Sequence, residues 1–304
     1  MMLTADITNI SRGSFHDGPG IRTVVYFNGC LMQCKWCHNP ETISRSRDIL
    51  YIQSKCIHCG QCIELCPEQH RIDGHDMIFI REGCLGCGKC AEECPSGALS
   101  ICGEDYTVET LMRELRKDRL YFDQSGGGVT LSGGECLLHA DFCLETLRAC
   151  RAEGIHTCIE TALFVPEENM LKVLPWINHI FADLKLPDEL RHKKYTGRSN
   201  QLILSNLKKL STLHDNITLR IPLIPGVNDS EDDMVLFAEI INTLGSGIRG
   251  VELLKYNYLA ESKYTVAGKD YTRFGDNAQS DERVKALCEA LQASLVEELP
   301  VFFQ

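Results

Sequence analysis

The chain has 304 residues, of which 44% are hydrophobic and 24% are charged, so it can bury the core of one large domain or of a domain with a smaller module. The formal net charge of −11 argues against nonspecific binding to nucleic acid or to an anionic membrane. No apolar run approaches the roughly 18 residues of a membrane span, and the amino terminus lacks the basic start and apolar core of a secretory signal. We therefore expect a cytoplasmic protein with neither a membrane nor a nucleic acid as its partner.

The cysteines are the most informative residue type in this sequence. There are 17 of them, and eleven lie between Cys30 and Cys94, separated mostly by two or three residues. Such spacings suit metal ligation better than disulfide bonds, and ligand cysteines must stay reduced. The pattern predicts metal centres in a protein of a reducing compartment.

The predicted elements alternate along most of the chain. A buried strand at residues 22–27 runs into the first cysteines, and between about 51 and 101 the sequence becomes dense in Cys, Gly and Pro, which indicates an inserted module. Helices and strands then follow one another. The predicted helices lie at 108–120, 140–152, 166–173, 202–213, 231–244 and near 281–297, and the strands at 128–131, 156–159, 179–184, 217–223 and 250–254.

Counted from residue 22, this pattern gives six β-then-α units, which implies a parallel sheet with right-handed crossovers. The predicted fold class is α/β: a partial (β/α)₆ TIM-like barrel with an inserted ferredoxin-like module that carries two [4Fe–4S] clusters. We assign residues 1–50 to the first part of the barrel, 51–102 to the insertion and 103–304 to the remainder of the barrel. Reactive sites lie at the carboxyl ends of parallel strands, so we expect the polar motifs after the strands to converge.

Three cysteines follow the first strand at C-x₃-C-x₂-C spacing: Cys30, Cys34 and Cys37. A cubane cluster has four irons, so three thiolates leave one iron for a ligand from outside the protein. Such an open position is typical of a catalytic metal centre. A structural zinc site completed by His38 or a distant cysteine is the alternative, but zinc sites favour paired C-x₂-C units.

Two complete ferredoxin-type runs, C-x₂-C-x₂-C-x₃-C-P, lie in the insertion. In two-cluster ferredoxins the last cysteine of each run binds the cluster of the other run. One predicted cluster therefore uses Cys56, Cys59, Cys62 and Cys94, and the other uses Cys84, Cys87, Cys90 and Cys66. We expect these closed clusters to transfer electrons or to stabilise the fold; zinc knuckles are the alternative.

Polar motifs stand at the ends of three later strands. In the turn Ser132–Glu135, Gly133 and Gly134 let the backbone approach a ligand closely, and Glu135 can accept a hydrogen bond from an ammonium group. Asp183 and Lys185 lie two residues apart, on the same side of an extended segment, where they can grip a zwitterionic or ribose-bearing ligand. Taken alone, each motif also fits a plain structural role: an ordinary turn, a surface salt bridge or, for Glu160, a structural carboxylate.

With its cysteine loop and its Ser132–Glu135 turn, the chain resembles the radical S-adenosylmethionine superfamily. More narrowly, it resembles the glycyl radical enzyme activating enzymes of the pyruvate formate-lyase activase type, through residues 17–30, 36–41, 125–135, 156–161, 183–185 and 224–228. The two-cluster insertion is similar to that of the longer subgroup. The resemblance covers nearly the whole chain.

The resemblance implies that S-adenosylmethionine chelates the open iron, that one electron cleaves its C5′–S bond, and that the 5′-deoxyadenosyl radical takes a hydrogen from a backbone glycine. It implies Cys30, Cys34, Cys37 and Asp17 as catalytic residues, with Asp17 near the incoming glycine loop. The cofactor contacts that it implies are Trp36, Cys37, His38, Gly133, Gly134, Glu135, Glu160, Asp183, Leu184, Lys185 and Asn257. This chain departs from the family pattern at Asn257, where relatives often have histidine, and at Cys136, where proline is usual.

The implied cofactors are three [4Fe–4S] clusters, one open and two of ferredoxin type, and S-adenosylmethionine. The implied partners are a glycyl radical enzyme, whose carboxy-terminal glycine loop is the substrate, and flavodoxin or ferredoxin as electron donor. Two alternatives remain: a radical S-adenosylmethionine enzyme that acts on a small molecule, and an iron–sulfur electron-transfer protein.

Overall fold

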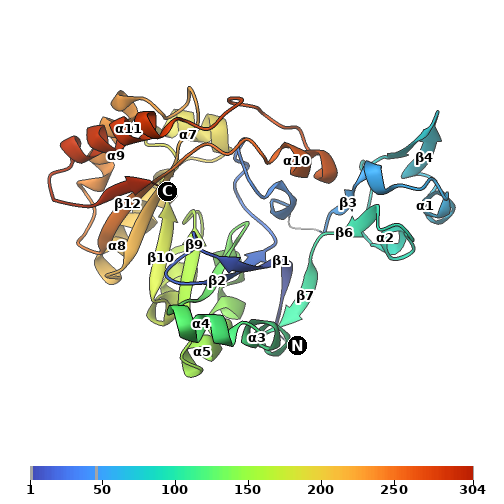
Figure 1. The fold of residues 1–304 in the computed structure, drawn as a ribbon, viewed down its shortest axis with the longest axis horizontal. Helices are drawn as coiled ribbons and strands as arrows, with labels where there is room; N and C mark the ends of the chain where they lie inside the picture. Colours follow the sequence, from blue (N-terminus) through green and yellow to red (C-terminus); the bar gives the residue numbers. More distant parts are fainter. Residues whose placement is uncertain (1–2, 45–46, 304) are drawn as a thin grey trace.

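The computed structural model describes residues 3–44 and 47–303 of the chain and is built around one nine-stranded sheet (Figure 1). The strands neighbour one another in the order β13-β12-β11-β10-β9-β8-β2-β1-β7. In chain order they are β1 (Thr4–Ser14), β2 (Arg22–Phe27), β7 (Glu104–Thr107), β8 (Gly128–Gly133), β9 (His156–Thr161), β10 (His179–Asp183), β11 (Ile217–Pro222), β12 (Ile248–Leu254) and β13 (Val301–Phe303).

Seven of these strands, β2 and β8 to β13, run parallel, and each lies beside the next one in the chain. This arrangement confirms the predicted α/β class with a large parallel sheet, and it is consistent with a partial barrel. At one edge β1 and β7 pair antiparallel, which the sequence analysis did not predict. β1 is half-exposed along most of its length, so it lacks the apolar run by which the buried parallel strands were recognised.

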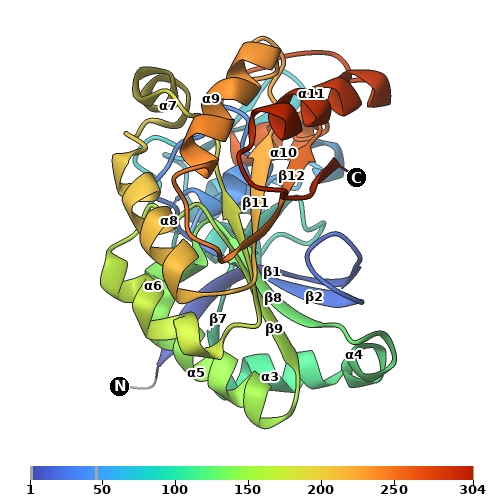
Figure 2. The same cartoon turned by 90° about the vertical axis from the view of Figure 1, so that its left-hand side faces the viewer.

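Helices cover the outer face of the sheet (Figure 2). In chain order the helices outside the cysteine-rich segment are α3 (Val108–Arg116), α4 (Arg119–Ser125), α5 (Ala140–Ala152), α6 (Glu167–Val173), α7 (Glu189–Thr196), α8 (Gln201–Leu213), α9 (Glu231–Ile241), α10 (Glu261–Ala267) and α11 (Asp281–Ser294), of which α10 lies instead beside the segment that follows the first cysteines. The single helix predicted at 108–120 is two helices, and α7 and α10 were not predicted. None of the helices in the described residues is long and apolar enough to cross a membrane.

The helical run is interrupted between α3 and α4, where the side chain of Asp118 contacts the sheet. Its buried carboxylate accepts a hydrogen bond from the hydroxyl of Thr23 on β2 at 2.8 Å and forms an ion pair with Arg12 on β1. These contacts tie the end of α3 to the sheet, and the helix restarts at Arg119. A tertiary contact therefore overrides an apolar spacing that would have allowed one continuous helix.

The concave side of the sheet carries buried charges. The guanidinium of Arg220 on β11 donates to the carboxylate of Glu252 on β12 at 2.7 Å, forms a second ion pair with Glu160 on β9, and lies 3.7 Å from the ring centroid of Phe181. Arg22 is fully buried and donates to Thr130 at 3.0 Å. Buried charges persist only when they are paired and hydrogen-bonded, so the parallel strands are held in register partly by these contacts.

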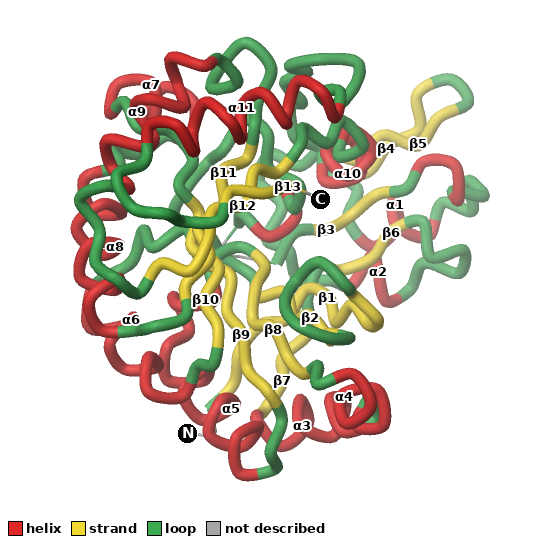
Figure 3. The backbone as a smooth tube through the Cα atoms, turned by 60° about the vertical axis from the view of Figure 1, so that its left-hand side comes forward, coloured by secondary structure: helices red, strands yellow, loops and turns green. Residues whose placement is uncertain are grey.

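The cysteine-rich insertion projects from the side of the sheet (Figures 1 and 3). It leaves and rejoins the rest of the chain at an antiparallel pair of strands, and it has its own small core of Ile49, Met77, Cys90 and Leu99. Its elements are β3 (Ile49–Tyr51), α1 (Gln61–Leu65), β4 (His70–Asp73), β5 (Asp76–Phe79), α2 (Lys89–Glu92) and β6 (Leu99–Ile101). Helix α10 packs against β3, so the insertion also contacts the carboxy-terminal part of the chain.

A pH-dependent contribution to stability is expected from His179, the first residue of β10. Burial lowers its pKa to about 4, aided by the nearby His156, Arg220 and Arg22. Since an unfolded histidine titrates near 6.5, the unfolded state binds more protons between about pH 6.5 and 4, and stability falls as the pH falls through this window. Discounted for partial exposure, the effect should be about 1 kcal/mol, or about 2–4 °C in Tm.

Thermal unfolding of the cluster-free chain at pH 7.0 and 4.5 tests this expectation. The Tm of His179→Asn should fall less between the two pH values than that of the unchanged chain. His75→Asn, at an exposed position, is the matched control and should fall as the unchanged chain does. Equal losses for all three chains would contradict a neutral, buried His179.

Candidate active site

A cavity of about 490 Å³ opens at the carboxyl ends of the parallel strands. Thiols, carboxylates, a buried ammonium group and aromatic rings meet there. Its polar and aromatic lining comprises Asp17, Tyr26, Cys30, Cys34, Trp36, Cys37, His38, Asn39, Ser132, Glu160, Thr161, Asp183, Lys185, Arg220, Lys255, Tyr256, Asn257 and Lys263, with Gly133 and Gly134 on the same surface. Motifs that follow different strands in the sequence therefore share one site.

Cys30, Cys34 and Cys37, which we call the cysteine loop, all line this cavity. The loop is closed on itself by a hydrogen bond from the Cys37 N–H to the Cys34 carbonyl at 3.1 Å. Burial raises the pKa of the Cys30 thiol to about 11 and that of Cys34 to about 12. Because metals bind the thiolate, loading iron onto this loop must release protons and should become more favourable as the pH rises.

The turn after β8 lies directly on the cysteine loop. The N–H of Gly134 donates to the Phe27 carbonyl and the N–H of Glu135 donates to the Gly29 carbonyl, each at 2.9 Å. A Cβ atom on Gly134 would come within 2.3 Å of the Gly29 oxygen and 2.7 Å of the Thr42 oxygen. Gly133 has φ +107°, and a Cβ there would meet the Phe27 nitrogen at 2.2 Å. Only glycine permits this approach of two backbones at the cavity surface.

Asp183 and Lys185 form an ion pair inside the cavity, with 2.6 Å between the Lys185 Nζ and the Asp183 Oδ2. Burial opposes the charge of Lys185, but the negative charge of Asp183 and its hydrogen bond to the ammonium outweigh burial, so the pKa of this lysine lies above its ordinary value. The site therefore holds a fixed ammonium group beside the thiols. It also holds a carboxylate that can accept hydrogen bonds from a ligand.

Glu160 and Asp17 bring two further carboxylates to the cavity. The Glu160 carboxylate accepts a hydrogen bond from the Ser132 hydroxyl at 2.5 Å and pairs with Arg220. Burial raises the pKa of Glu160, Arg220 opposes this effect and the negative charge of Asp17 adds to it. The Asp17 segment is fixed from both sides, because the Asp17 carbonyl accepts from Thr130 at 2.6 Å and Arg220 donates to the carbonyl of His16.

Two of the residues implied as cofactor contacts do not line the cavity. Glu135 is buried, and its carboxylate accepts from the Thr161 hydroxyl at 2.8 Å and from the backbone N–H groups of Leu137 and Ala162. These bonds connect the turn after β8 to the end of β9. Leu184 is buried in the main core. Glu135 therefore supports the turn from beneath the cavity surface and is not part of the cavity lining.

The other implied contacts lie on the cavity surface. The Nε2 of His38 stands 3.0 Å from the Asn257 carbonyl, so this nitrogen must carry the proton that it donates. The side-chain oxygen of Asn257 accepts from the N–H of Leu259 at 2.9 Å, which fixes the turn leading into α10. Trp36 packs edge-on against Phe274, with its ring also near Tyr195.

Arg220, Tyr26 and Lys263 also line the cavity, and the sequence analysis missed them. Arg220 stands in the middle of a predicted apolar strand, and a charged residue at such a position was the available signal for a buried functional group. Lys263 lies on α10, which is too short to give a periodic pattern, so no sequence signal pointed to it.

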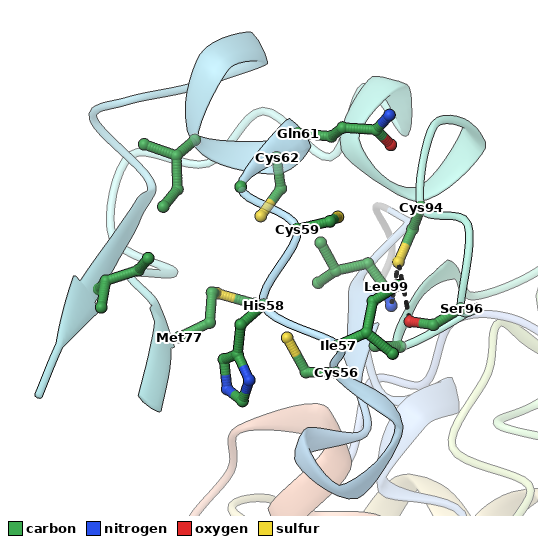
Figure 4. A pocket seen from close by; sticks show the side chains of 14 residues that line it. Cys56, Ile57, His58, Cys59, Gln61, Cys62, Met77, Cys94, Ser96 and Leu99 are labelled. Atoms are coloured by element: carbon green, nitrogen blue, oxygen red, sulfur yellow. Dashed lines mark hydrogen bonds between the residues drawn. The ribbon is translucent and has the colours of Figure 1, made fainter. Parts of the chain in front are cut away.

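A second, smaller cavity of about 20 Å³ lies in the insertion (Figure 4). Four cysteines line it: Cys56, Cys59, Cys62 and Cys94. The Cys94 Sγ accepts a hydrogen bond from the N–H of Leu99 at 3.5 Å and lies 3.7 Å from the Ser96 hydroxyl. The fold thus brings the last cysteine of the second run to the first three cysteines of the first run.

Replacing Gly134 should disrupt the contact between the turn and the cysteine loop. We expect Gly134→Ala to lower the free energy of unfolding by about 1–3 kcal/mol, because the added methyl must displace two backbone carbonyls. Anaerobic denaturant unfolding of the cluster-free chain measures this loss. Gly275→Ala is the control, since its Cβ would come no closer than 3.3 Å to the Pro225 ring and 3.6 Å to the Asn277 oxygen. Equal stability of the two variants would contradict the tight approach at Gly134.

Comparison with known proteins places this site in a family. The sequence model of the Radical SAM superfamily matches residues 24–238 of this chain. The chain is 43% identical over 272 residues to the (2S)-3-sulfopropanediol dehydratase activating enzyme of Klebsiella oxytoca, covering 87% of this chain and 86% of that protein. It is 41% identical over 290 residues to the trans-4-hydroxy-L-proline dehydratase activating enzyme of Clostridioides difficile, covering 95% and 96%.

A solved structure supports the fold. A radical SAM methyltransferase from Sphaerobacter thermophilus superposes with a TM-score of 0.57 at 14% identity, covering 98% of this chain and 76% of that one. The matched relatives at 35–43% identity carry names of activating enzymes, among them one for a pyruvate formate-lyase of Escherichia coli. This chain belongs to the radical SAM superfamily and, within it, to the activating enzymes of glycyl radical enzymes.

Proposed function

We propose that this chain holds a [4Fe–4S] cluster on Cys30, Cys34 and Cys37, binds S-adenosylmethionine in the adjoining cavity, and abstracts a hydrogen from a backbone glycine of a partner glycyl radical enzyme. The observation that carries this proposal is the convergence of the three thiols, the Asp183–Lys185 pair and the Gly133–Gly134 backbone on one cavity of about 490 Å³. Activating enzymes of this kind are the relatives that the chain matches over most of its length.

The donor set fits such a cluster. Three thiols would supply ligands for three irons, and the adjoining cavity is large enough for a nucleoside-sized ligand of the fourth. In the described residues, no three His, Cys, Asp or Glu side chains converge on one point as the ligands of a single metal ion do. A cubane does not require this, because each of its thiolates binds a different iron.

Residues of the chain have separate roles toward the methionine and ribose parts of the ligand. Lys185 would hold its carboxylate, and Asp183 and Glu160 would accept from its ammonium or hydroxyl groups. Gly133 and Gly134 expose backbone without side chains, so the ligand can lie close to the cysteine loop. When bound, the reduced cluster supplies the single electron that cleaves the C5′–S bond.

Trp36 and His38 would flank the adenine ring. Trp36 is packed among aromatic side chains, and His38 is hydrogen-bonded to the Asn257 carbonyl, so both positions are fixed before a ligand arrives. Asp17, held by Thr130 and Ser14, stands at the same cavity and is proposed to meet the glycine loop of the partner. A site that encloses the radical on several sides protects it from water and from unwanted hydrogen donors.

We further propose that the insertion holds two closed [4Fe–4S] clusters that relay electrons from flavodoxin or ferredoxin, in a reducing cytoplasm. The cavity lined by Cys56, Cys59, Cys62 and Cys94 supports the crossed ligand pattern for the first cluster. Cys84, Cys87, Cys90 and Cys66 are the proposed ligands of the second cluster. Hydrogen bonds to Sγ, such as that from Leu99 to Cys94, are among the features that set a cluster's potential.

Removing one ligand of the open cluster should abolish the chemistry. With Cys34→Ala, anaerobically reconstituted protein should produce 5′-deoxyadenosine at least about 100-fold more slowly, because only two thiolates remain to hold the cluster. Cys288→Ala, on helix α11, is the control and should keep the normal rate. A normal rate for Cys34→Ala would refute the ligand assignment.

The proposed substrate is tested with the partner protein. The enzyme, S-adenosylmethionine and a reductant should generate a glycine-centred radical signal in a glycyl radical enzyme, and a partner with that glycine replaced by alanine should give none. Rapid 5′-deoxyadenosine formation with a small molecule, and no protein radical in any glycyl radical enzyme tried, would favour a small-molecule enzyme instead.

Loss of one closed cluster should slow electron delivery without removing the active site. Cys59→Ala should reduce the iron content from about twelve to about eight atoms per chain. Activation of the partner by flavodoxin should slow, while binding of S-adenosylmethionine should persist. Unchanged activation together with lowered iron content would exclude the relay role.

A further inference from the structure

Tyr264, in the middle of helix α10, carries a buried hydroxyl group whose proton has no acceptor among the described residues. The residue is 4% exposed, and its hydroxyl donates no hydrogen bond to the part of the chain that the structure describes. Its ring packs on Tyr271, with 5.1 Å between the centroids. Buried hydroxyl groups nearly always donate a hydrogen bond, so a hydroxyl proton without an acceptor indicates an acceptor that the polypeptide itself does not supply.

Helix α10 is fastened to the residues that directly follow the cysteine loop. The Nζ of Lys263 donates to the side chain of Asn39 at 2.9 Å and pairs with Glu41 at 3.2 Å, and the Nζ of Lys269 donates to the Pro40 carbonyl at 2.5 Å. On its other side, Arg81 of the insertion donates to the Val266 carbonyl at 2.8 Å. Figure 1 shows α10 between the sheet and the insertion. The helix is therefore held from two sides.

Tyr264 lies on the side of α10 that faces the cysteine loop. The backbone N–H of Cys37 lies within hydrogen-bonding reach of the Tyr264 oxygen; burial, and then the proximity of Cys37 and Cys34, raise the pKa of this hydroxyl, and the Cys37 N–H lowers it. Ala260 and Lys263 of the same helix line the cavity that Cys34 and Cys37 also line, whereas Tyr264 does not. The hydroxyl thus approaches the cysteine loop from behind the cavity, where S-adenosylmethionine is not proposed to bind.

We propose that the Tyr264 hydroxyl donates a hydrogen bond to the sulfur of the cluster held by the cysteine loop, either a bridging sulfide or the Cys37 Sγ, and thereby raises the reduction potential of that cluster. The inference rests on the proposed function of Cys30, Cys34 and Cys37. A reduced cluster carries one more negative charge, so a donor aimed at its sulfur stabilises the reduced form more than the oxidised form. In the low dielectric of a protein interior, a hydrogen bond to sulfur is electrostatically stronger than in water, so a single such bond can shift the potential measurably.

This bond would act in the same direction as Lys185. At Cys34 and Cys37, Lys185 favours added negative charge, whereas Asp183 and Glu41 disfavour it. A donor from α10 would add to the effect of Lys185 without occupying the open iron. Tyr264 is accordingly a positioning and tuning residue, and it makes no contact with the reacting atoms.

The test compares Tyr264→Phe with Tyr271→Phe in the anaerobically reconstituted holoenzyme. Both changes delete one phenolic hydroxyl from the same ring pair, but the Tyr271 hydroxyl lies 3.1 Å from that of Tyr256 and donates to the Tyr258 carbonyl at 3.2 Å. The potential is measured by redox titration, following the electron paramagnetic resonance signal that changes when S-adenosylmethionine is added. That signal identifies the open cluster among the three.

Tyr264→Phe should shift the titration to a more negative potential, so that the ratio of reduced to oxidised open cluster at a fixed poise falls about tenfold, equivalent to about 59 mV for a one-electron couple. Tyr271→Phe should have the same reduction potential as the unchanged protein. Electron–nuclear double resonance in H₂O and D₂O detects the couplings of exchangeable protons to the reduced open cluster. One of these couplings should be absent in Tyr264→Phe and present in Tyr271→Phe.

If Tyr264→Phe and the unchanged protein gave the same redox titration and the same proton couplings, the proposed hydrogen bond would be refuted. If the unchanged protein shows no cluster signal that responds to S-adenosylmethionine, the proposed function itself has failed, and this outcome is separate from the first. Equal shifts in both variants would also overturn the inference, because they would indicate a general loosening of the Tyr264–Tyr271 pair.

Discussion

The site depends on one close contact between two backbones. At the end of β8 the chain turns so tightly that its N–H groups bond the carbonyls of residues 27 and 29, at the point where the cysteine loop begins. No side chain fits between the two segments at Gly134. The contact joins the first parallel strand to the second at their carboxyl ends, and it presents bare backbone to the cavity beside the thiols. The positions of the thiols and of the glycine backbone on this surface depend on that contact.

Buried charges on the concave side of the sheet connect further strands to this site. Arg220 bonds carboxylates from β9 and β12 and a carbonyl just before Asp17, so it links the strand ends to the segment at the cavity opening. Leaving any one of these charges unpaired in the interior would be costly, and the set therefore acts as a unit. The same unit holds Glu160 facing the cavity.

Glu135 and Tyr264 illustrate two ways in which a polar group supports a site without lying on its surface. The Glu135 carboxylate satisfies one hydroxyl and two backbone donors below the surface and fixes the glycine turn. Tyr264 approaches from the opposite side, on a helix bonded both to the segment after the cysteine loop and to the insertion. That helix gives the two cysteine-rich parts of the chain a shared structural element.

The sequence by itself determined the parallel α/β pattern, the three-cysteine loop, both four-cysteine runs and the glycine turn, because spacing along the chain carries this information directly. It also pointed to Asp183 and Lys185, since residues two apart in an extended segment share a face. Only the tertiary structure decided that Glu135 faces inward, that Arg220 links three segments, and that β1, β7 and α10 complete the fold. These features arise from contacts between residues far apart in the chain, such as those of Arg220 with Glu160 and of Lys263 with Glu41, and no local pattern encodes such contacts.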